Sequence, residues 1–470
     1  MISKQRVCDL VDRAASDIEW CWGVLAELKN KKQSTNGREI AELQGKLTGA
    51  IWLLDDLYRD IHAERRRLIS KKEKLNLSWF KRRMASLDDY QKAIRHAISI
   101  AKVVGDGFAW IFYVRERELI EAHLKLPRQL HLPPKIGRTG ERAFIEKLQV
   151  LEGRLVLYHG ITSFLRMGDV SFYDFSQQRI TNIGELKTKH VGGNEYRVNL
   201  GFVYGGKFSP VVSLSEAKRL EGRSPKMELR HAQKLDRQLK QIAKAISPDD
   251  SRIKQAKSLK GTFYFDELDR LLEASSSRAF NWKKVGRGLL IGTLRLRNES
   301  LLSKRLVANG KFHIGKKFDG ANEAAKSILD PALAGNSLLI SNLGVGESGV
   351  PGLMKGTIPA FWWPIKTERL HDLIFSNVIA ITLYNPAPFW HLLRSKGFEL
   401  SIGERAQLKA AKIPIGKRVA TLHNFEYFQS LITQYLMSED DVVSMIESAL
   451  DFPAPDGAPM RVEISPQLRF

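Results

Sequence analysis

Cysteine is almost absent from this sequence of 470 residues, in which only Cys8 and Cys21 occur. Two cysteines are too few for a four-cysteine zinc site or for a framework of disulfide bonds. The 11 histidines include no H-E-x-x-H pair, which argues against a zinc hydrolase. The G-x-S-x-G motif of serine hydrolases and the G-x-x-x-x-G-K-[ST] motif of ATPases are also missing.

Long apolar stretches are lacking as well. The longest apolar-leaning stretch, residues 373–384, is too short and too polar to span a bilayer. Residues 1–13 do not contain the apolar core of a signal peptide. We therefore expect a soluble, cytoplasmic protein with no membrane contact.

Acidic residues are outnumbered by basic ones. The sequence has 74 Lys and Arg against 52 Asp and Glu, a formal net charge of +22. A charge of this size favours polyanionic partners, and nucleic acid is the first of these. Hydrophobic residues make up 43% and charged residues 27%, which is typical of a folded chain.

The sequence divides into four regions. Residues 1–124 predict a basic helical domain, because apolar residues recur at three- and four-residue spacing with few prolines or glycines. Residues 125–140 contain prolines and glycines and predict a linker. Residues 141–299 predict the order helix, three strands, helix, strand, an αβββαβ core with a mixed sheet. Residues 300–470 predict a further α/β domain of unknown role, so the expected fold class is α/β.

Ser438 is expected to cap a helix in this last region. Acidic residues follow it in the first turn, which suits the N-terminal end of a helix.

A basic stretch at residues 65–83 lies inside the helical region, with Trp79 and Phe80 near its end. Two interpretations are open. The stretch is either a phosphate-contacting face whose aromatic residues stack on sugar or base, or a solvated helix surface whose aromatic residues pack in the core. The candidate nucleic-acid contacts here are Arg65, Arg66, Lys81 and Arg82.

Two short predicted strands at residues 166–190 carry charge where core strands would be apolar. Side chains alternate along a strand, so Glu185 and Lys187 share one face, which Asp169 reaches if the two strands pair. Converging carboxylates repel each other unless a cation lies between them, and oxygen ligands suit Mg²⁺. The alternative for Glu185 and Lys187 is a cross-strand ion pair on an exposed sheet face.

The spacing of these residues resembles the PD-(D/E)xK nuclease superfamily. Gly168-Asp169 is followed, after residues 170–184, by Glu185-Leu186-Lys187. Gly140-Glu141 opens the preceding helix, where the family carries a glutamate. The resemblance covers roughly residues 136–297. A looser likeness, through the segment at residues 105–110, is to uncharacterised bacterial proteins with a helical region before such a core.

The resemblance implies a role for each matching residue. Asp169 and Glu185 would bind Mg²⁺, or Mn²⁺ in its place, together with the Leu186 carbonyl. Lys187 would position the attacking water, and Glu141 would hold a second metal or reach the first through water. Basic and amide side chains on the following helix would contact the nucleic acid: Lys234, Arg237 and Gln238.

The expected function is therefore that of a Mg²⁺-dependent deoxyribonuclease, with DNA preferred over RNA. The resemblance further suggests bacterial defence against foreign DNA. Two alternatives stay open: a nucleic-acid-binding protein that keeps the fold without cutting, and a sensor or partner-binding subunit of a multi-protein system. A homodimer or partner proteins are compatible with either.

Overall fold

The chain has a mixed α/β fold, as predicted, and divides into two compact units: Met1–Asp249 with Leu301–Val307, and Asp250–Ser300 with Ala308–Phe470. The computed structural model describes residues 1–31, 37–127, 131, 136–147, 150–151, 153–192, 195–204, 207–208, 212–214, 237–240, 242, 253–255, 261–276, 279–296, 319–330, 337–345, 353–354, 356–403, 408–415, 418–450 and 461–463. Across these residues, the helices found are all too short or too polar to cross a membrane.

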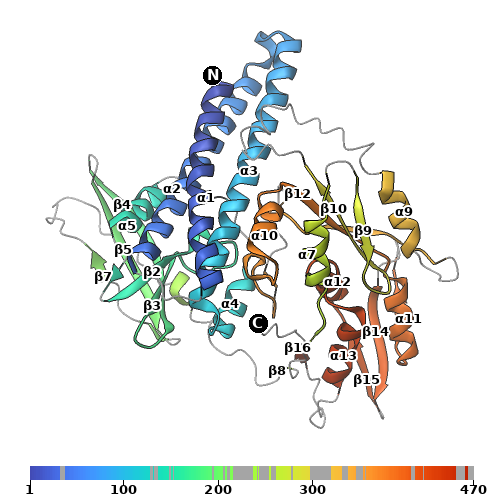
Figure 1. Cartoon of the computed structure of the whole chain (residues 1–470). Helices are drawn as coiled ribbons and strands as arrows, with labels where there is room; N and C mark the ends of the chain where they lie inside the picture. Colours follow the sequence, from blue (N-terminus) through green and yellow to red (C-terminus); the bar gives the residue numbers. More distant parts are fainter. Residues whose placement is uncertain are drawn as a thin grey trace. The chain divides into compact units, whose positions relative to one another are not determined.

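Helices form the beginning of the first unit, where the sequence predicted them. They are α1 (Lys4–Lys31), α2 (Gly37–Ser70), η1 (Lys72–Lys74), α3 (Leu77–Tyr113) and α4 (Arg117–Leu124). Helices α1, α2 and α3 pack against one another and run side by side (Figure 1). The Asn76 side chain begins α3 by accepting a hydrogen bond from the Trp79 backbone N–H at 3.0 Å.

One antiparallel sheet completes the first unit. Its elements are α5 (Ile136–Lys147), β1 (Val150–Leu151), β2 (Arg154–Tyr158), η2 (His159–Ile161), β3 (Val170–Asp174), β4 (Arg179–Gly192), β5 (Glu195–Tyr204), β6 (Lys207–Phe208) and β7 (Val212–Leu214). The strands lie in the order β1-β2-β3-β4-β5-β6, and β7 also pairs with β5. Helix α5 packs on β4 and β5. The predicted strand pair is thus β3 and β4, with Val170 opposite Gly184.

Two sequence predictions for this region need correction. Helix α5 begins at Ile136, so the last residues of the predicted linker, 125–140, are helical. The predicted closing strand of the αβββαβ core, within residues 286–297, belongs to the sheet of the second unit. The first compact unit, Met1–Asp249 with Leu301–Val307, includes the helical region together with the sheet. The predicted helix at 227–247 is described only at residues 237–240 and 242, which are helical.

The second unit contains small sheets and short helices. Its elements are β8 (Ile253–Gln255), α7 (Phe265–Glu273), β9 (Asn281–Lys284), β10 (Leu289–Arg295), α9 (Asp319–Ile328), β11 (Leu339–Asn342), η4 (Ala360–Trp362), α10 (Thr367–Ile374), β12 (Val378–Tyr384), α11 (Ala387–Ser395), β13 (Glu399–Ile402), β14 (Leu408–Ile415), β15 (Arg418–Leu422), α12 (Phe425–Thr433), α13 (Glu439–Leu450) and β16 (Arg461–Glu463). The sheet orders are β11-β12-β10-β9, β13-β14-β15 and β16-β8.

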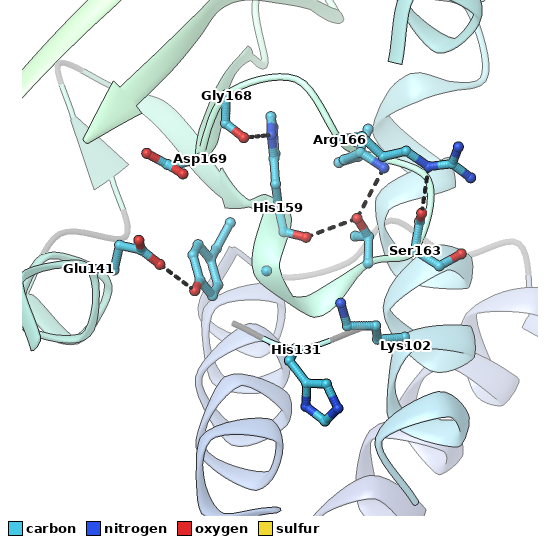
Figure 2. A pocket seen from close by; sticks show the side chains of 12 residues that line it. Lys102, His131, Glu141, His159, Ser163, Arg166, Gly168 and Asp169 are labelled. Atoms are coloured by element: carbon cyan, nitrogen blue, oxygen red, sulfur yellow. Dashed lines mark hydrogen bonds between the residues drawn. The ribbon is translucent and has the colours of Figure 1, made fainter. Parts of the chain in front are cut away.

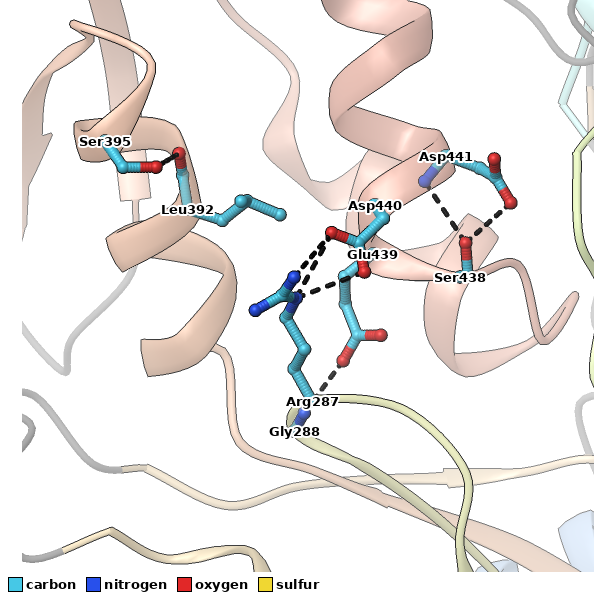
Figure 3. A network of polar contacts seen from close by, with 8 residues as sticks. All are labelled: Arg287, Gly288, Leu392, Ser395, Ser438, Glu439, Asp440 and Asp441. Atoms are coloured by element: carbon cyan, nitrogen blue, oxygen red, sulfur yellow. Dashed lines mark hydrogen bonds and ion pairs between the residues drawn. The ribbon is translucent and has the colours of Figure 1, made fainter.

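A polar network fixes the start of α13 against the turn between β9 and β10 (Figure 3). The Ser438 hydroxyl accepts a hydrogen bond from the Asp441 backbone N–H at 3.1 Å, which confirms the predicted cap. The buried Glu439 carboxylate accepts from the Gly288 N–H at 2.8 Å, and Arg287 pairs with Asp440 at 2.9 Å. These contacts satisfy backbone N–H groups at the start of α13 and in the turn before β10, so we interpret the network as structural.

Candidate active site

Two glycines let β3 and β4 approach closely where the charged residues lie. Gly168 has φ +72°, a left-handed conformation, and an added Cβ would come within 2.7 Å of the Gly184 carbonyl oxygen. The Asp169 N–H donates to that same oxygen at 2.8 Å. A Cβ on Gly184 would in turn lie 2.9 Å from the Val170 side chain on β3. This close approach places Asp169 beside Glu185 in the register of the two strands.

The structure brings together the four residues that the Asp/Glu-x-Lys pattern predicted. Asp169 Oδ2 accepts a hydrogen bond from the Leu186 N–H at 2.7 Å. The Lys187 ammonium donates to Glu185 Oε1 at 2.5 Å and to the Leu186 carbonyl at 3.2 Å. The ion pair of the alternative interpretation is therefore present, but it lies within β4, and the Glu185 side chain is only 9% exposed, so it is not on an exposed sheet face.

Glu141 joins the group from helix α5. It is buried, and its Oε2 accepts a hydrogen bond from the Tyr158 hydroxyl at 2.9 Å. Burial, followed by the negative charges of Glu141 and Asp169, raises the pKa of Tyr158 well above its ordinary value. Tyr158 therefore keeps its proton and remains a hydrogen-bond donor to Glu141.

Negative charge is concentrated around Asp169. Burial raises the pKa of Asp169 well above its usual range, and the charges of Glu185 and Glu141 raise it further. The Leu186 N–H and the Lys187 ammonium act in the opposite direction. A cation bound at Asp169 would act against burial and against these two carboxylates, and would favour the ionised form.

The oxygen ligands available here suit Mg²⁺, because this ion does not need a complete set of side-chain ligands. Within the part of the chain that the structure describes, no group of three or more His, Cys, Asp or Glu residues could hold a metal ion. Mg²⁺ keeps several waters and takes as few as one or two carboxylates, so Asp169, Glu185 and the Leu186 carbonyl are a sufficient set. Lys187 contacts two of these ligands and would have to move away from them for the ion to bind.

A cavity of about 80 Å³ adjoins the carboxylates. Asp169 and Glu141 line it, as do Lys102, Ser163 and Arg166 (Figure 2). The Arg166 guanidinium is fixed to backbone carbonyls: its Nε donates to Ser163 at 3.0 Å and its Nη1 to Leu126 at 2.7 Å.

Helix α3 supports the loop that leads to Asp169. A Cβ on Gly105 would come within 2.0 Å of the Ile161 carbonyl oxygen, so only glycine allows α3 to pack this closely on η2. Next to it, the buried Asp106 accepts from the Ser163 N–H at 2.6 Å and from the Ser163 hydroxyl at 2.5 Å. Gly105 and Asp106 both lie in the segment at 105–110 that supported the looser likeness.

Sequence reasoning missed a chain of buried hydrogen bonds behind Asp169. His159 Nδ1 lies 3.0 Å from the Gly168 carbonyl and must donate to it, so His159 Nε2 accepts from the Ser171 hydroxyl at 2.6 Å. The Tyr113 hydroxyl lies 2.5 Å from Ser171 and donates in turn. Burial lowers the pKa of His159 to about 4, consistent with this neutral ring.

A second buried histidine, His123, holds the backbone of the same loop. His123 Nδ1 accepts hydrogen bonds from the N–H groups of Arg166 and Met167, each at 3.0 Å. Burial lowers the pKa of His123 well below its ordinary value. Neither histidine has a sequence neighbour that marks it, so no motif could have identified them.

The basic stretch lies apart from the carboxylates. Its candidate contacts flank the turn between α2 and α3, at the upper end of the helices in Figure 1: Arg65, Arg66, Lys81 and Arg82. The sheet meets α2 near Gln44, whose amide donates to the Val156 carbonyl at 2.8 Å. At 1.5 Å per helical residue, Arg66 lies roughly 30 Å along the axis from Gln44. The structure therefore does not bring these residues to Asp169.

Side-chain positions at the basic stretch favour neither interpretation fully. Arg66, Lys81 and Arg82 are exposed, whereas Arg65 pairs with Asp88. Trp79 and Phe80 are half-buried.

The helical residues after the sheet lie closer to the site. Leu239 and Ile242 pack in a core cluster with Met167, which precedes β3, and Ile183, which lies in β4. Arg237 is exposed, and the buried amide oxygen of Gln238 has no hydrogen-bond partner among the described residues. Lys234 lies outside the described residues.

Comparison with known proteins returns no relative. The chain matches no family model, and no curated protein or solved structure matches it significantly. Function must therefore be argued from the geometry of the site.

Proposed function

We propose that this protein is a Mg²⁺-dependent endonuclease that hydrolyses phosphodiester bonds in DNA in the cytoplasm. The observation that carries the proposal is the convergence of Asp169, Glu185 and Lys187 on one side of a tightly paired β3 and β4. The resemblance of this spacing to the PD-(D/E)xK superfamily supports the same reaction. A role in bacterial defence rests on that resemblance.

Each residue of the site has a defined task in this proposal. Asp169, Glu185 and the Leu186 carbonyl would hold the ion, which when bound would polarise the phosphate and lower the pKa of water. Lys187 moves from Glu185 to the attacking water and orients it, while its charge favours the phosphate oxygens. Glu141, fixed by Tyr158, adds negative charge on the helix side of the site.

DNA binding is assigned to basic residues outside this group. The formal charge of +22 attracts polyanions, and Arg66, Lys81 and Arg82 are exposed for phosphate contact. Arg237 and Gln238 would contact DNA nearer to the strand pair, because their helical segment packs beside it.

The test is cleavage of supercoiled plasmid, linear duplex DNA and RNA, each with Mg²⁺, Mn²⁺ or EDTA. We expect metal-dependent cutting of DNA that Lys187→Ala reduces by about 10²–10⁴-fold, the typical contribution of a positioned proton-transfer group. Lys283→Ala is the matched control, because Lys283 also lies in a strand and pairs with a glutamate, at 2.6 Å. Equal cutting by wild type and Lys187→Ala would contradict the proposal.

A non-cutting nucleic-acid-binding protein is the second candidate. The contact of Lys187 with both Glu185 and the Leu186 carbonyl favours it, because this lysine already supplies positive charge to the ligands. In that case the protein would bind DNA with strong salt dependence, equally well with Mg²⁺ or EDTA, and neither the wild type nor Lys187→Ala would cut it.

A further inference from the structure

The cavity beside Asp169 has a basic wall that the predicted nuclease residues do not explain. Lys102 extends from α3 towards the loop of residues 159–163 (Figure 2). It is only 3% exposed, yet it lines the cavity. Arg166 lines the same cavity, held by the carbonyls of Ser163 and Leu126. Two cationic side chains from separate elements therefore border one small space.

The loop beside these two side chains is rigidly held. Thr162 and Ser163 are buried, line the cavity and follow η2 directly. Their loop is fixed from both sides, by Asp106 on α3 and by His123 on α4. The Thr162 hydroxyl donates to the His159 carbonyl at 3.0 Å and the Ser163 hydroxyl to Asp106, so the groups that would bind phosphate oxygens are the Lys102 ammonium and the Arg166 guanidinium.

The size of the cavity limits what it can hold. One water needs roughly 10–15 Å³, so a cavity of about 80 Å³ accepts a group of about six non-hydrogen atoms. A phosphate group has this size and a nucleobase is larger. Asp169 and Glu141 line the same cavity, so the bound group would lie next to the carboxylates.

We propose that this cavity binds a phosphate group of the substrate strand, with Lys102 as its principal counter-charge and Arg166 as the second. The identity of the strand as DNA rests on the proposed nuclease function, whereas phosphate binding by this wall does not. Lys102 is thereby a substrate-binding residue supplied by the helical region. Two sources share the required chemistry: a terminal phosphate monoester and an internal phosphodiester.

The first test uses inorganic phosphate as the probe, with its affinity measured by calorimetry on the full chain. Lys102→Met should weaken phosphate binding about ten- to hundred-fold, the loss of one charge-assisted hydrogen bond, and Lys102→Arg should restore most of it. Lys92→Met is the matched control, because Lys92 lies exposed on the same helix. Absence of phosphate binding by the wild type, or equal binding by Lys102→Met, would overturn the proposal.

The second test distinguishes the two phosphate sources by fluorescence anisotropy in EDTA, with one oligonucleotide carrying either a 5′-phosphate or a 5′-hydroxyl. A preference for the 5′-phosphate that Lys102→Met removes would assign a terminal phosphate. An equal loss of affinity for both would assign an internal phosphodiester. Wild-type affinity of Lys102→Met for both would contradict the assignment.

These measurements do not need cleavage, so they separate the two proposals. A protein that never cuts DNA can still lose phosphate binding in Lys102→Met, and an active nuclease can retain it. Circular dichroism checks that each variant folds. If Lys102→Met does not fold, Arg166→Gln on the same cavity carries the test, and unchanged phosphate affinity there would overturn the proposal.

Discussion

At the scale of single residues, Asp169 occupies a position that is unfavourable for an ionised carboxylate. Its burial and the neighbouring Glu185 and Glu141 raise its pKa, although the Leu186 N–H stabilises the charged form. Residues kept under such conditions commonly serve a function at the expense of stability.

Replacing Asp169 by Asn should therefore stabilise the protein by about 0.5–2 kcal/mol at neutral pH without metal. The amide still accepts from Leu186 and adds no negative charge. Because the pKa of Asp169 is raised in the folded state, the folded protein binds more protons and wild-type stability falls as pH rises above 3.8 through the raised pKa. Urea unfolding measured across this pH range should show that the stability of Asp169→Asn does not fall in this way.

Asp174 provides the control of opposite sign. Hydrogen bonds from Ser176 and Gln177 lower the pKa of this carboxyl, so its contribution is present above 3.8 and lost as pH falls through the lowered pKa. Asp174→Asn should thus destabilise the protein at neutral pH. An Asp169→Asn variant less stable than the wild type would contradict this account.

At the scale of elements, the carboxylates depend on how closely α3 approaches η2. Gly105 allows this approach, and Gly168 and Gly184 allow that of β3 to β4. The loop between η2 and β3 is held from behind by the neutral His159 and His123.

Gly105→Ala tests the packing of α3. The added methyl would overlap the Ile161 carbonyl, so we expect the free energy of unfolding to fall by about 1–3 kcal/mol. Gly49→Ala is the control within α2, because its Cβ would meet nothing within 4 Å and should stabilise the helix by about 0.5–1 kcal/mol. Chemical denaturation of both variants measures the difference, and equal effects would contradict the packing argument.

The sequence allowed prediction of the strand pair but not of the elements around it. Alternation placed Glu185 and Lys187 on one face, and in the structure the two side chains contact each other. The apolar strand β10 was assigned to the wrong sheet, because a buried strand of seven residues carries no signal for its partner. The contact of Asp106 with Ser163 joins residues 57 positions apart, so no local pattern could have predicted it.

At the scale of the whole molecule, basic charge and the candidate site lie at separate places on the first unit. Arg66 is roughly 30 Å along α2 from Gln44, where the helix meets β2. Duplex DNA rises 3.4 Å per base pair, so a duplex that contacts both places would cover about nine base pairs.

Salt dependence of DNA binding tests the basic turn. Removing two phosphate contacts with Arg66→Ala and Arg82→Ala should make the negative slope of log K against log salt shallower by about 2 between about 50 and 200 mM salt. The control Arg270→Ala with Lys283→Ala removes the same charge from residues paired with Glu267 in the second unit. Fluorescence anisotropy measures both slopes, and equal slopes for the two double variants would contradict a role for the turn.

The central claim is that β3 and β4 carry charge because they present a metal ion. A calorimetric titration of Mg²⁺ into wild type and Asp169→Asn at neutral pH tests it most directly. We predict that the wild type binds Mg²⁺ with release of protons, because a cation favours the ionised Asp169, and that Asp169→Asn does not bind it. Equal binding by both proteins, or binding by neither, would contradict the claim.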